Sequence, residues 1–178
     1  VPMRDGVQLS TQIHLPGSGK YPAVLSRGYG KGFNGNVKAF NDAGYVCVGQ
    51  MCRGNGGKDG SRFFPDKDDG YDTIEWIAEQ PWCDGNVAMY GRSYWGATQW
   101  RAALAQPPHL KAIIPQAISA DGWQCGYRMN GAVTLAMTAH GRAGDRQDPA
   151  FYRHLPLIDL DRAGLGKENK LWNDYLSH

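Results

Sequence analysis

The sequence predicts an α/β fold, with a mostly parallel sheet and flanking helices, for about the first 121 residues. Short runs of β-prone residues alternate there with segments of helical spacing. Such an alternation is typical of βαβ units, whose strands lie parallel. With 178 residues, 42% of them hydrophobic, the chain can bury a core of this kind.

Five short segments have strand character. They lie at 7–15, 21–25, 45–49, 86–90 and 110–118. The first alternates loosely after the turn signal at Asp5-Gly6, and the others are compact, largely apolar runs that suit buried parallel strands. Glycine-rich loops follow the second and third strands, at 28–32 and 53–60, and loops of this kind often carry functional sites.

Three segments between these strands have helical spacing. They lie at 34–43, 71–78 and 94–105. Glycine is common just after the last turn of a helix, so Gly44 is a suitable end for the first of these segments. The second places Tyr71, Ile74 and Ile77 on one face and stops before Pro81.

The pattern changes near Asp121, where we place a boundary between residues 1–121 and 122–178. The later region shows helical pieces at 131–140 and 169–176 and no clear strand. We find no internal repeat.

Composition excludes several classes of partner. Lys and Arg number 19 against 17 Asp and Glu, a formal charge of +2, and both signs interleave, so we expect no nucleic-acid partner. The longest apolar runs have four or five residues, whereas a membrane span needs about 20, so we expect no membrane insertion. The four cysteines form no CxxC pair, which favours reduced, buried thiols over a metal site.

The most informative segment is Gly91-Arg92-Ser93-Tyr94-Trp95-Gly96. A serine on a sharp turn between a strand and a helix, with small neighbours, is typical of the nucleophile of a serine hydrolase. The usual motif has glycine two residues before and two after the serine, and here Trp95 takes the second place. The alternative is that Ser93 only caps the following helix.

At this point the chain resembles the cocaine esterase and X-Pro dipeptidyl-peptidase family of serine hydrolases. The resemblance rests on several blocks in the same order. These are residues 1–7, the loop at Arg53-Gly54, residues 70–76, the Ser93 segment, residues 106–112 and Leu155-Pro156-Leu157. It covers nearly the whole chain and is strongest from Asp69 to Ala112.

The resemblance implies the N-terminal half of an α/β-hydrolase domain in residues 1–121 and the start of an inserted helical cap in 122–178. It implies that Ser93 attacks an ester or amide carbonyl, with the Tyr29 hydroxyl and the Tyr94 backbone N–H as oxyanion donors. No cofactor is implied, because acyl transfer through serine needs none. Three positions depart from the family pattern: Gly28 replaces a proline, Met51 an aspartate and Trp95 a leucine.

The catalytic acid and base are not evident. In this fold they follow the serine in the order Asp or Glu, then His, and we expect both beyond His178 in a longer protein. The order of residues along the chain also permits Asp121 as the acid and His140, His154 or His178 as the base. The chain would then be a complete small hydrolase. We interpret His14 and His109 as structural.

Several questions stay open at this level. The substrate is a small ester or amide, including X-Pro peptides, and Trp123, Tyr127 and Met129 are candidates to line an acyl pocket or to form cap core. A non-catalytic half-domain that pairs with a complementary chain, or a homo-oligomer, is the alternative. We expect a cytoplasmic location, with secretion left open because the chain begins at Val1.

Overall fold

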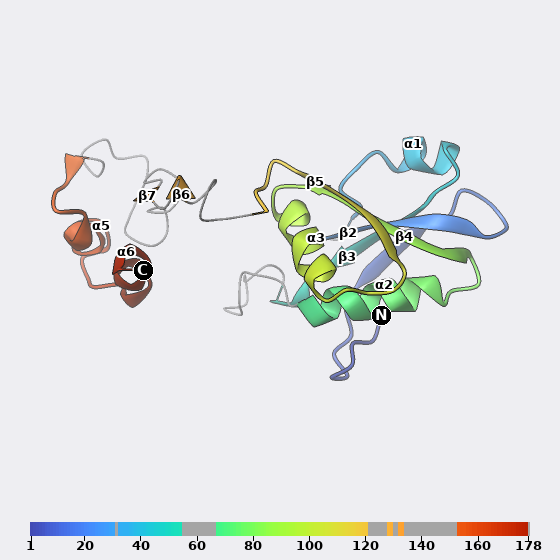
Figure 1. Cartoon of the computed structure of the whole chain (residues 1–178), viewed down its shortest axis with the longest axis horizontal. Helices are drawn as coiled ribbons and strands as arrows, with labels where there is room; N and C mark the ends of the chain where they lie inside the picture. The colour runs from blue at the N-terminus through green and yellow to red at the C-terminus, as the bar shows by residue number, and fades with distance from the viewer. Residues whose placement is uncertain (31, 55–66, 121–127, 130–131, 134–152, 178) are drawn as a thin grey trace. The chain divides into compact units, whose positions relative to one another are not determined.

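The computed structural model describes residues 1–30, 32–54, 67–120, 128–129, 132–133 and 153–177. The chain divides into two compact units, Val1–Ala120 and Asp121–His178 (Figure 1). The first contains the predicted sheet.

Five strands form that sheet. They are β1 (Thr11–His14), β2 (Tyr21–Gly28), β3 (Val46–Met51), β4 (Cys83–Arg92) and β5 (Leu110–Gln116). Their order across the sheet is β1-β3-β2-β4-β5. All neighbours are parallel except β1, which is antiparallel to β3. The predicted α/β fold with a mostly parallel sheet is therefore confirmed.

The helices follow from this strand order. They are α1 (Val37–Asp42), α2 (Lys67–Ala78) and α3 (Tyr94–Leu104). The connection from β2 to β3 runs one way across the sheet, whereas those from β3 to β4 and from β4 to β5 run the other way. Because such crossovers are right-handed, α1 covers one face and α2 and α3 the other, as Figure 1 shows.

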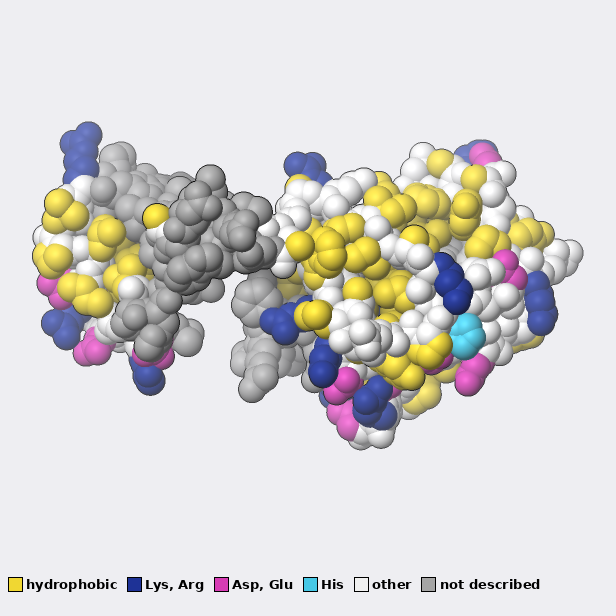
Figure 2. Space-filling model, viewed as in Figure 1, with side chains coloured by type: hydrophobic (Ala, Val, Ile, Leu, Met, Phe, Trp, Pro, Cys, Tyr) yellow, Lys and Arg dark blue, Asp and Glu magenta, His cyan; other side chains and the backbone are white. Residues whose placement is uncertain are grey.

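The core lies between the sheet and α2 and α3. Its fully buried members come from every central strand and from both helices. They are Ala23, Leu25, Val46, Val48, Ile74, Ile77, Cys83, Val87, Met89 and Ala102. By contrast, Ile114 on the edge strand β5 is 47% exposed, and Figure 2 shows hydrophobic side chains over this part of the unit.

Three strand boundaries differ by three or more residues from those expected. β2 runs to Gly28, three residues beyond its expected end. β1 begins only at Thr11, because the preceding residues form a separate β-bridge between Pro2 and Gln8. β4 begins at Cys83, because the Asp84-Gly85 segment is an irregularity within the strand, with Gly85 at φ 88°, rather than a turn before it.

The second unit contains a short hairpin that the sequence did not predict. β6 (Arg128–Met129) pairs antiparallel with β7 (Ala132–Val133), so at least the start of the helix expected at 131–140 is wrong. The helices are η3 (Leu157–Asp159), α5 (Leu160–Leu165) and α6 (Lys170–Ser177), the last close to the expected 169–176. Trp172 is fully buried and its indole N–H donates to the Leu157 carbonyl.

Cys47, Cys52 and Cys83 are free and buried, as expected, and Cys125 lies outside the described residues. Within the part of the chain that is described, no helix is both long and apolar enough to cross a bilayer.

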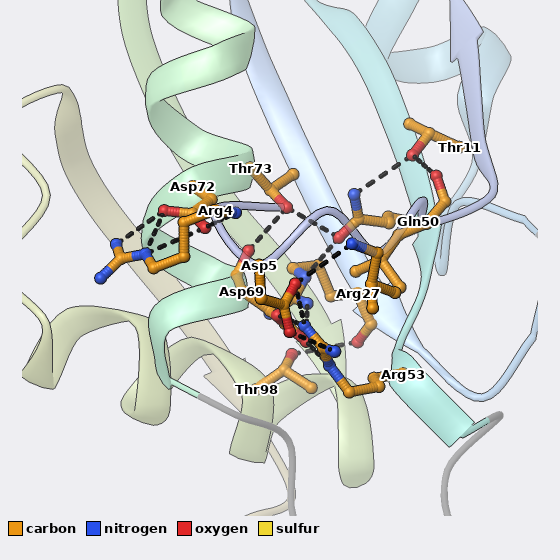
Figure 3. Close-up of polar contacts among 12 residues, drawn as sticks. Arg4, Asp5, Thr11, Arg27, Gln50, Arg53, Asp69, Asp72, Thr73 and Thr98 are labelled. Atoms are coloured by element: carbon orange, nitrogen blue, oxygen red, sulfur yellow. Dashed lines mark hydrogen bonds and ion pairs between the residues drawn. The ribbon is translucent and has the colours of Figure 1, made fainter. Parts of the chain in front are cut away.

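An ion pair attaches the N-terminal segment to α2 (Figure 3). The Arg4 guanidinium donates to both carboxylate oxygens of Asp72, at 2.6 to 3.1 Å, and its backbone N–H donates to the same group at 2.8 Å. Burial alone would raise the pKa of Asp72, but these hydrogen bonds hold it below its ordinary value of 3.8. Folding therefore favours the ionised carboxylate.

We predict that Asp72→Ala lowers the free energy of unfolding at pH 7 by up to about 1 kcal/mol, the usual range for a partly exposed pair. Because the folded pKa of Asp72 is depressed, this contribution is present above pH 4 and disappears as the pH falls through the folded value. Urea unfolding at pH 7, 5, 4 and 3 measures it. Arg4→Met should reduce the same pH dependence without abolishing it, because the backbone N–H of residue 4 still donates to Asp72. A difference between wild type and Asp72→Ala that is constant down to pH 3 would contradict the assignment.

Candidate active site

Ser93 occupies a sharp turn between β4 and α3. Its backbone has φ 57° and ψ −117°, a region that residues other than glycine rarely adopt. The Ser93 N–H donates to the Gln116 carbonyl of β5 at 2.8 Å, and its own carbonyl accepts from Gly96 and Ala97 in the first turn of α3. The turn is therefore held from both sides.

The Ser93 side chain is exposed and makes no capping hydrogen bond to α3. The alternative that Ser93 only caps this helix is therefore wrong. A strained backbone that presents a hydroxyl to solvent at the carboxyl end of a parallel strand is the geometry of a nucleophile elbow.

Two glycines make this turn possible. A Cβ at Gly91, whose φ is 153°, would lie 2.4 Å from the Cβ of Trp95. A Cβ at Gly96 would lie 2.4 Å from Ile118, just beyond β5. The turn thus needs its second glycine three residues after Ser93, against β5, which explains how Trp95 can stand in the usual glycine position.

Tyr29 follows the end of β2 and lies beside the elbow. Its ring centroid is 4.4 Å from that of Trp95 and 5.2 Å from that of Tyr94, the two residues directly after Ser93. Tyr29 is 40% exposed, so it is available to a ligand. The structure thus brings together the three residues singled out from the sequence, Ser93, Tyr29 and Tyr94.

The side chain of Tyr94, unlike those of Ser93 and Tyr29, is not exposed to solvent. Its side chain is buried, and this burial raises the pKa of the phenol, with the Cys52 thiol and Arg27 as its polar neighbours. Its backbone stands at the elbow, as the first residue of α3, while its buried ring packs against that of Tyr29.

The place of these residues follows from the strand order. The connections that leave β2 and β4 run in opposite directions across the sheet, and the two strands are neighbours. A parallel sheet opens a crevice at the carboxyl ends of two such strands, and ligands bind there. Tyr29 and Ser93 follow these two ends.

A side-chain amide joins the Tyr29 loop to the elbow. The Asn34 backbone N–H donates to the buried Ser26 hydroxyl of β2 at 3.1 Å, and its Oδ1 accepts the backbone N–H of Arg92, also at 3.1 Å. The loop between Gly28 and Asn36 is thereby attached at the residue before Ser93.

Gln99 of α3 holds the elbow by side-chain hydrogen bonds to backbone groups of β4, α3 and β5. It is fully buried. Its Nε2 donates to the carbonyls of Gly91 and Trp95, and its Oε1 accepts the Ile114 N–H at 2.8 Å. The helix is therefore fixed to the ends of both β4 and β5.

A buried polar cluster lies under the ends of β2 and β3 (Figure 3). Arg27 of β2, 1% exposed, donates through Nε to Gln50 Oε1 at 2.6 Å, and the Thr73 hydroxyl of α2 donates to the same oxygen at 2.9 Å. Asp69 of α2 accepts two hydrogen bonds from Arg53, at 2.6 and 3.1 Å.

Arg53 binds a second carboxylate, that of Asp5, at 2.7 Å. Hydrogen bonds to Asp69 and Asp5 raise the pKa of Arg53, and the bond from Arg53 lowers the pKa of Asp5. Arg53, at the start of the second glycine-rich loop, thus joins the N-terminal segment to α2 as part of the scaffold. In the sequence, the only sign of this cluster is a polar residue near the end of each of two buried strands, Arg27 and Gln50. That sign does not show that the two side chains bind one another.

No described histidine of the first unit can serve Ser93. His14 pairs with Cys47 near the start of β3, and His109 directly precedes β5. Gln116, seven positions after His109, lies beside the end of β4, so His109 is roughly 23 Å from that end at about 3.3 Å per residue. His109 Nδ1 instead lies 2.7 Å from Glu75, consistent with the structural role expected.

The other candidates lie elsewhere in the chain. His154 and Met129 belong to the second unit. Outside the described residues lie Asp121, Trp123, Tyr127, His140 and His178.

We predict that Gly91→Ala destabilises the chain by about 2–4 kcal/mol, because it combines a strained φ with a clash in a packed region. Gly44→Ala is the matched control, since Gly44 also has a positive φ, 82°, but no atom within 4 Å of the added Cβ. It should cost about 1 kcal/mol. Urea unfolding measures both, and equal losses would show that the contact with Trp95 contributes nothing.

Comparison with known proteins identifies the family. The family model described as X-Pro dipeptidyl-peptidase (S15 family) matches residues 5–163. Cocaine esterase from Rhodococcus sp. (strain MB1 Bresler) is 40% identical over 148 residues, which cover 76% of this chain and 26% of that protein. An Xaa-Pro dipeptidyl-peptidase from Lactiplantibacillus plantarum is 36% identical over 112 residues, covering 52% of this chain and 14% of that protein.

Solved structures agree. A CocE/NonD family hydrolase from Staphylococcus aureus superposes with a TM-score of 0.54 and 30% identity, covering 64% of this chain and 25% of that one. The chain spans about a quarter or less of the length of these relatives. It belongs to the X-Pro dipeptidyl-peptidase (S15) family, whose members are serine hydrolases with the α/β-hydrolase fold.

Proposed function

We propose that this chain supplies the nucleophile and oxyanion donors of a serine hydrolase that cleaves carboxylic ester or amide bonds, X-Pro peptides included. The observation that carries the proposal is the backbone of Ser93, strained at φ 57°, with an exposed side chain at the switch point of the sheet. Ser93 Oγ attacks the carbonyl carbon, the C–O or C–N bond breaks, and the alcohol or amine leaves with the proton of the serine hydroxyl. Water then hydrolyses the acyl-enzyme to the free acid and restores Ser93.

The developing oxyanion needs two hydrogen-bond donors. Tyr29 offers an exposed hydroxyl beside the elbow, and Tyr94 offers its backbone N–H at the start of α3, where the helix dipole favours negative charge. The Tyr94 phenol is buried away from the exposed Ser93 side chain, so its backbone N–H is the proposed donor.

The base and the acid that orients it come from sequence outside this chain. The positions of His14 and His109 at the far end of the sheet support this, as does the length of the relatives. Residues 122–178 then belong to an inserted cap that selects the substrate. Without a base, a serine hydroxyl is a poor nucleophile, so this chain alone should be nearly inert.

Hydrolysis of a short-chain nitrophenyl ester tests the proposal, in this chain and in the natural protein in which the sequence occurs. In the active protein Ser93→Ala should lower kcat by about 10⁴- to 10⁶-fold. Tyr29→Phe should lower kcat by about 10²- to 10³-fold, because one oxyanion donor is lost.

Tyr45→Phe is the matched control, a tyrosine that is also partly exposed but precedes the start of β3, and it should leave kcat unchanged. Activity that survives Ser93→Ala would refute the nucleophile. Turnover by this chain alone, abolished by Ser93→Ala, would show that a base lies within its own 178 residues.

A further inference from the structure

We propose that Trp95 is the positioning residue that fixes Tyr29 beside the elbow, and that the glycine at position 28 exists to admit its ring. This inference rests on the proposed function of Tyr29. It starts from the contacts of the indole, which lies between the ends of β2 and β4.

Glycines border Trp95 on both strands. A Cβ at Gly28 would lie 2.3 Å from Cε2, 2.4 Å from Nε1 and 2.7 Å from Cδ2 of the indole, and these are its three nearest atoms. A Cβ at Gly91 would lie 2.4 Å from the Cβ of Trp95. The side chain of Trp95 thus fills the space that a side chain at either position would need.

Backbone conformation does not require a glycine at position 28. Its φ lies outside the left-handed region, unlike that of Gly91. The backbone φ there is thus open to other residues, and the nearest obstacle to a side chain is the indole. Positions 28 and 95 are coupled: a large ring at 95 requires glycine at 28.

The backbone of Trp95 is itself fixed. Its carbonyl accepts from Gln99 Nε2 at 3.0 Å and lies 2.9 Å from the Thr98 hydroxyl, which also lies 3.0 Å from the carbonyl of Arg27, next to Gly28. Hydrogen bonds therefore fix the backbone that carries the indole, two residues after Ser93.

Tyr29 packs on this fixed ring. The two rings meet edge to face, with centroids 4.4 Å apart at 61°. The Trp95 indole nitrogen is buried and has no hydrogen-bond partner among the described residues. The ring therefore holds Tyr29 by its shape and by ring contact, not by a hydrogen bond.

The contact can be tested in this chain without activity. The nine tyrosines are labelled with 3-fluorotyrosine, and Tyr29→Phe identifies the fluorine resonance of Tyr29. We expect Trp95→Ala to move that resonance toward the position of free tyrosine, and Trp95→Phe to retain most of the original displacement. Trp82→Ala, which removes a tryptophan whose ring partner is Trp76, is the control and should leave the resonance unchanged.

Coupling between positions 28 and 95 gives a second measurement. Gly28→Ala should lower the thermal midpoint in the wild-type background and move the Tyr29 resonance as Trp95→Ala does. In the Trp95→Ala background the same substitution should lower the midpoint by less than half as much, because the ring is gone. Equal drops in both backgrounds, or a Tyr29 resonance unchanged by Trp95→Ala, would overturn the proposal.

In the active protein, Trp95→Ala should lower kcat by about 10- to 100-fold with KM within about twofold, the effect of a misplaced catalytic group. Trp95→Phe should restore most of kcat, which a loss of folding would not explain. If Ser93→Ala leaves activity intact, the proposed function fails, while the fluorine spectra still decide whether Trp95 positions Tyr29.

Discussion

The first unit depends on one constraint, the turn from β4 into α3 at Ser93 with a positive φ. A residue other than glycine in this region costs about 1–3 kcal/mol, and surrounding contacts must supply that energy. Here they come from the Gln116 carbonyl on β5, from Gln99 under the turn and from the close approach that Gly91 and Gly96 permit. Strain at the elbow is thus balanced by bonds to the neighbouring strand and helix.

A second requirement, at the ends of β2 and β3, is the compensation of a buried charge. Arg27 is a buried cation, and burying a charge is costly unless hydrogen bonds and opposite charge compensate it. Gln50 accepts from its Nε, and Asp69 lies 3.9 Å from its Nη2 while it holds Arg53. Removing one member would leave another buried and unpaired, so the cluster fixes the ends of β2 and β3 as a unit.

The sequence predicted the strands, the main helices and the elbow because each depends on local pattern: short β-prone runs, helical spacing before Pro81 and a serine among glycines. It did not predict the Arg27 cluster, the Asn34 link or the packing of Trp95 on Tyr29. Each of these depends on which strands are neighbours, and strand order is set by crossover direction, which residue spacing does not encode. The β6–β7 hairpin was missed because strands of two residues have no period to detect.

Strand order also determines which described residues of the first unit lie near Ser93. Tyr29 lies beside the Ser93 turn because β2 and β4 are neighbours. The connections after these two strands leave the carboxyl end of the sheet in opposite directions. A base must enter the same crevice, yet His14 and His109 lie at the opposite end of the strands, where His109 binds Glu75. The base that the proposed mechanism needs therefore comes from a segment other than the five strands of this sheet, while the proposed donors, Tyr29 and Tyr94, directly follow β2 and the turn after β4.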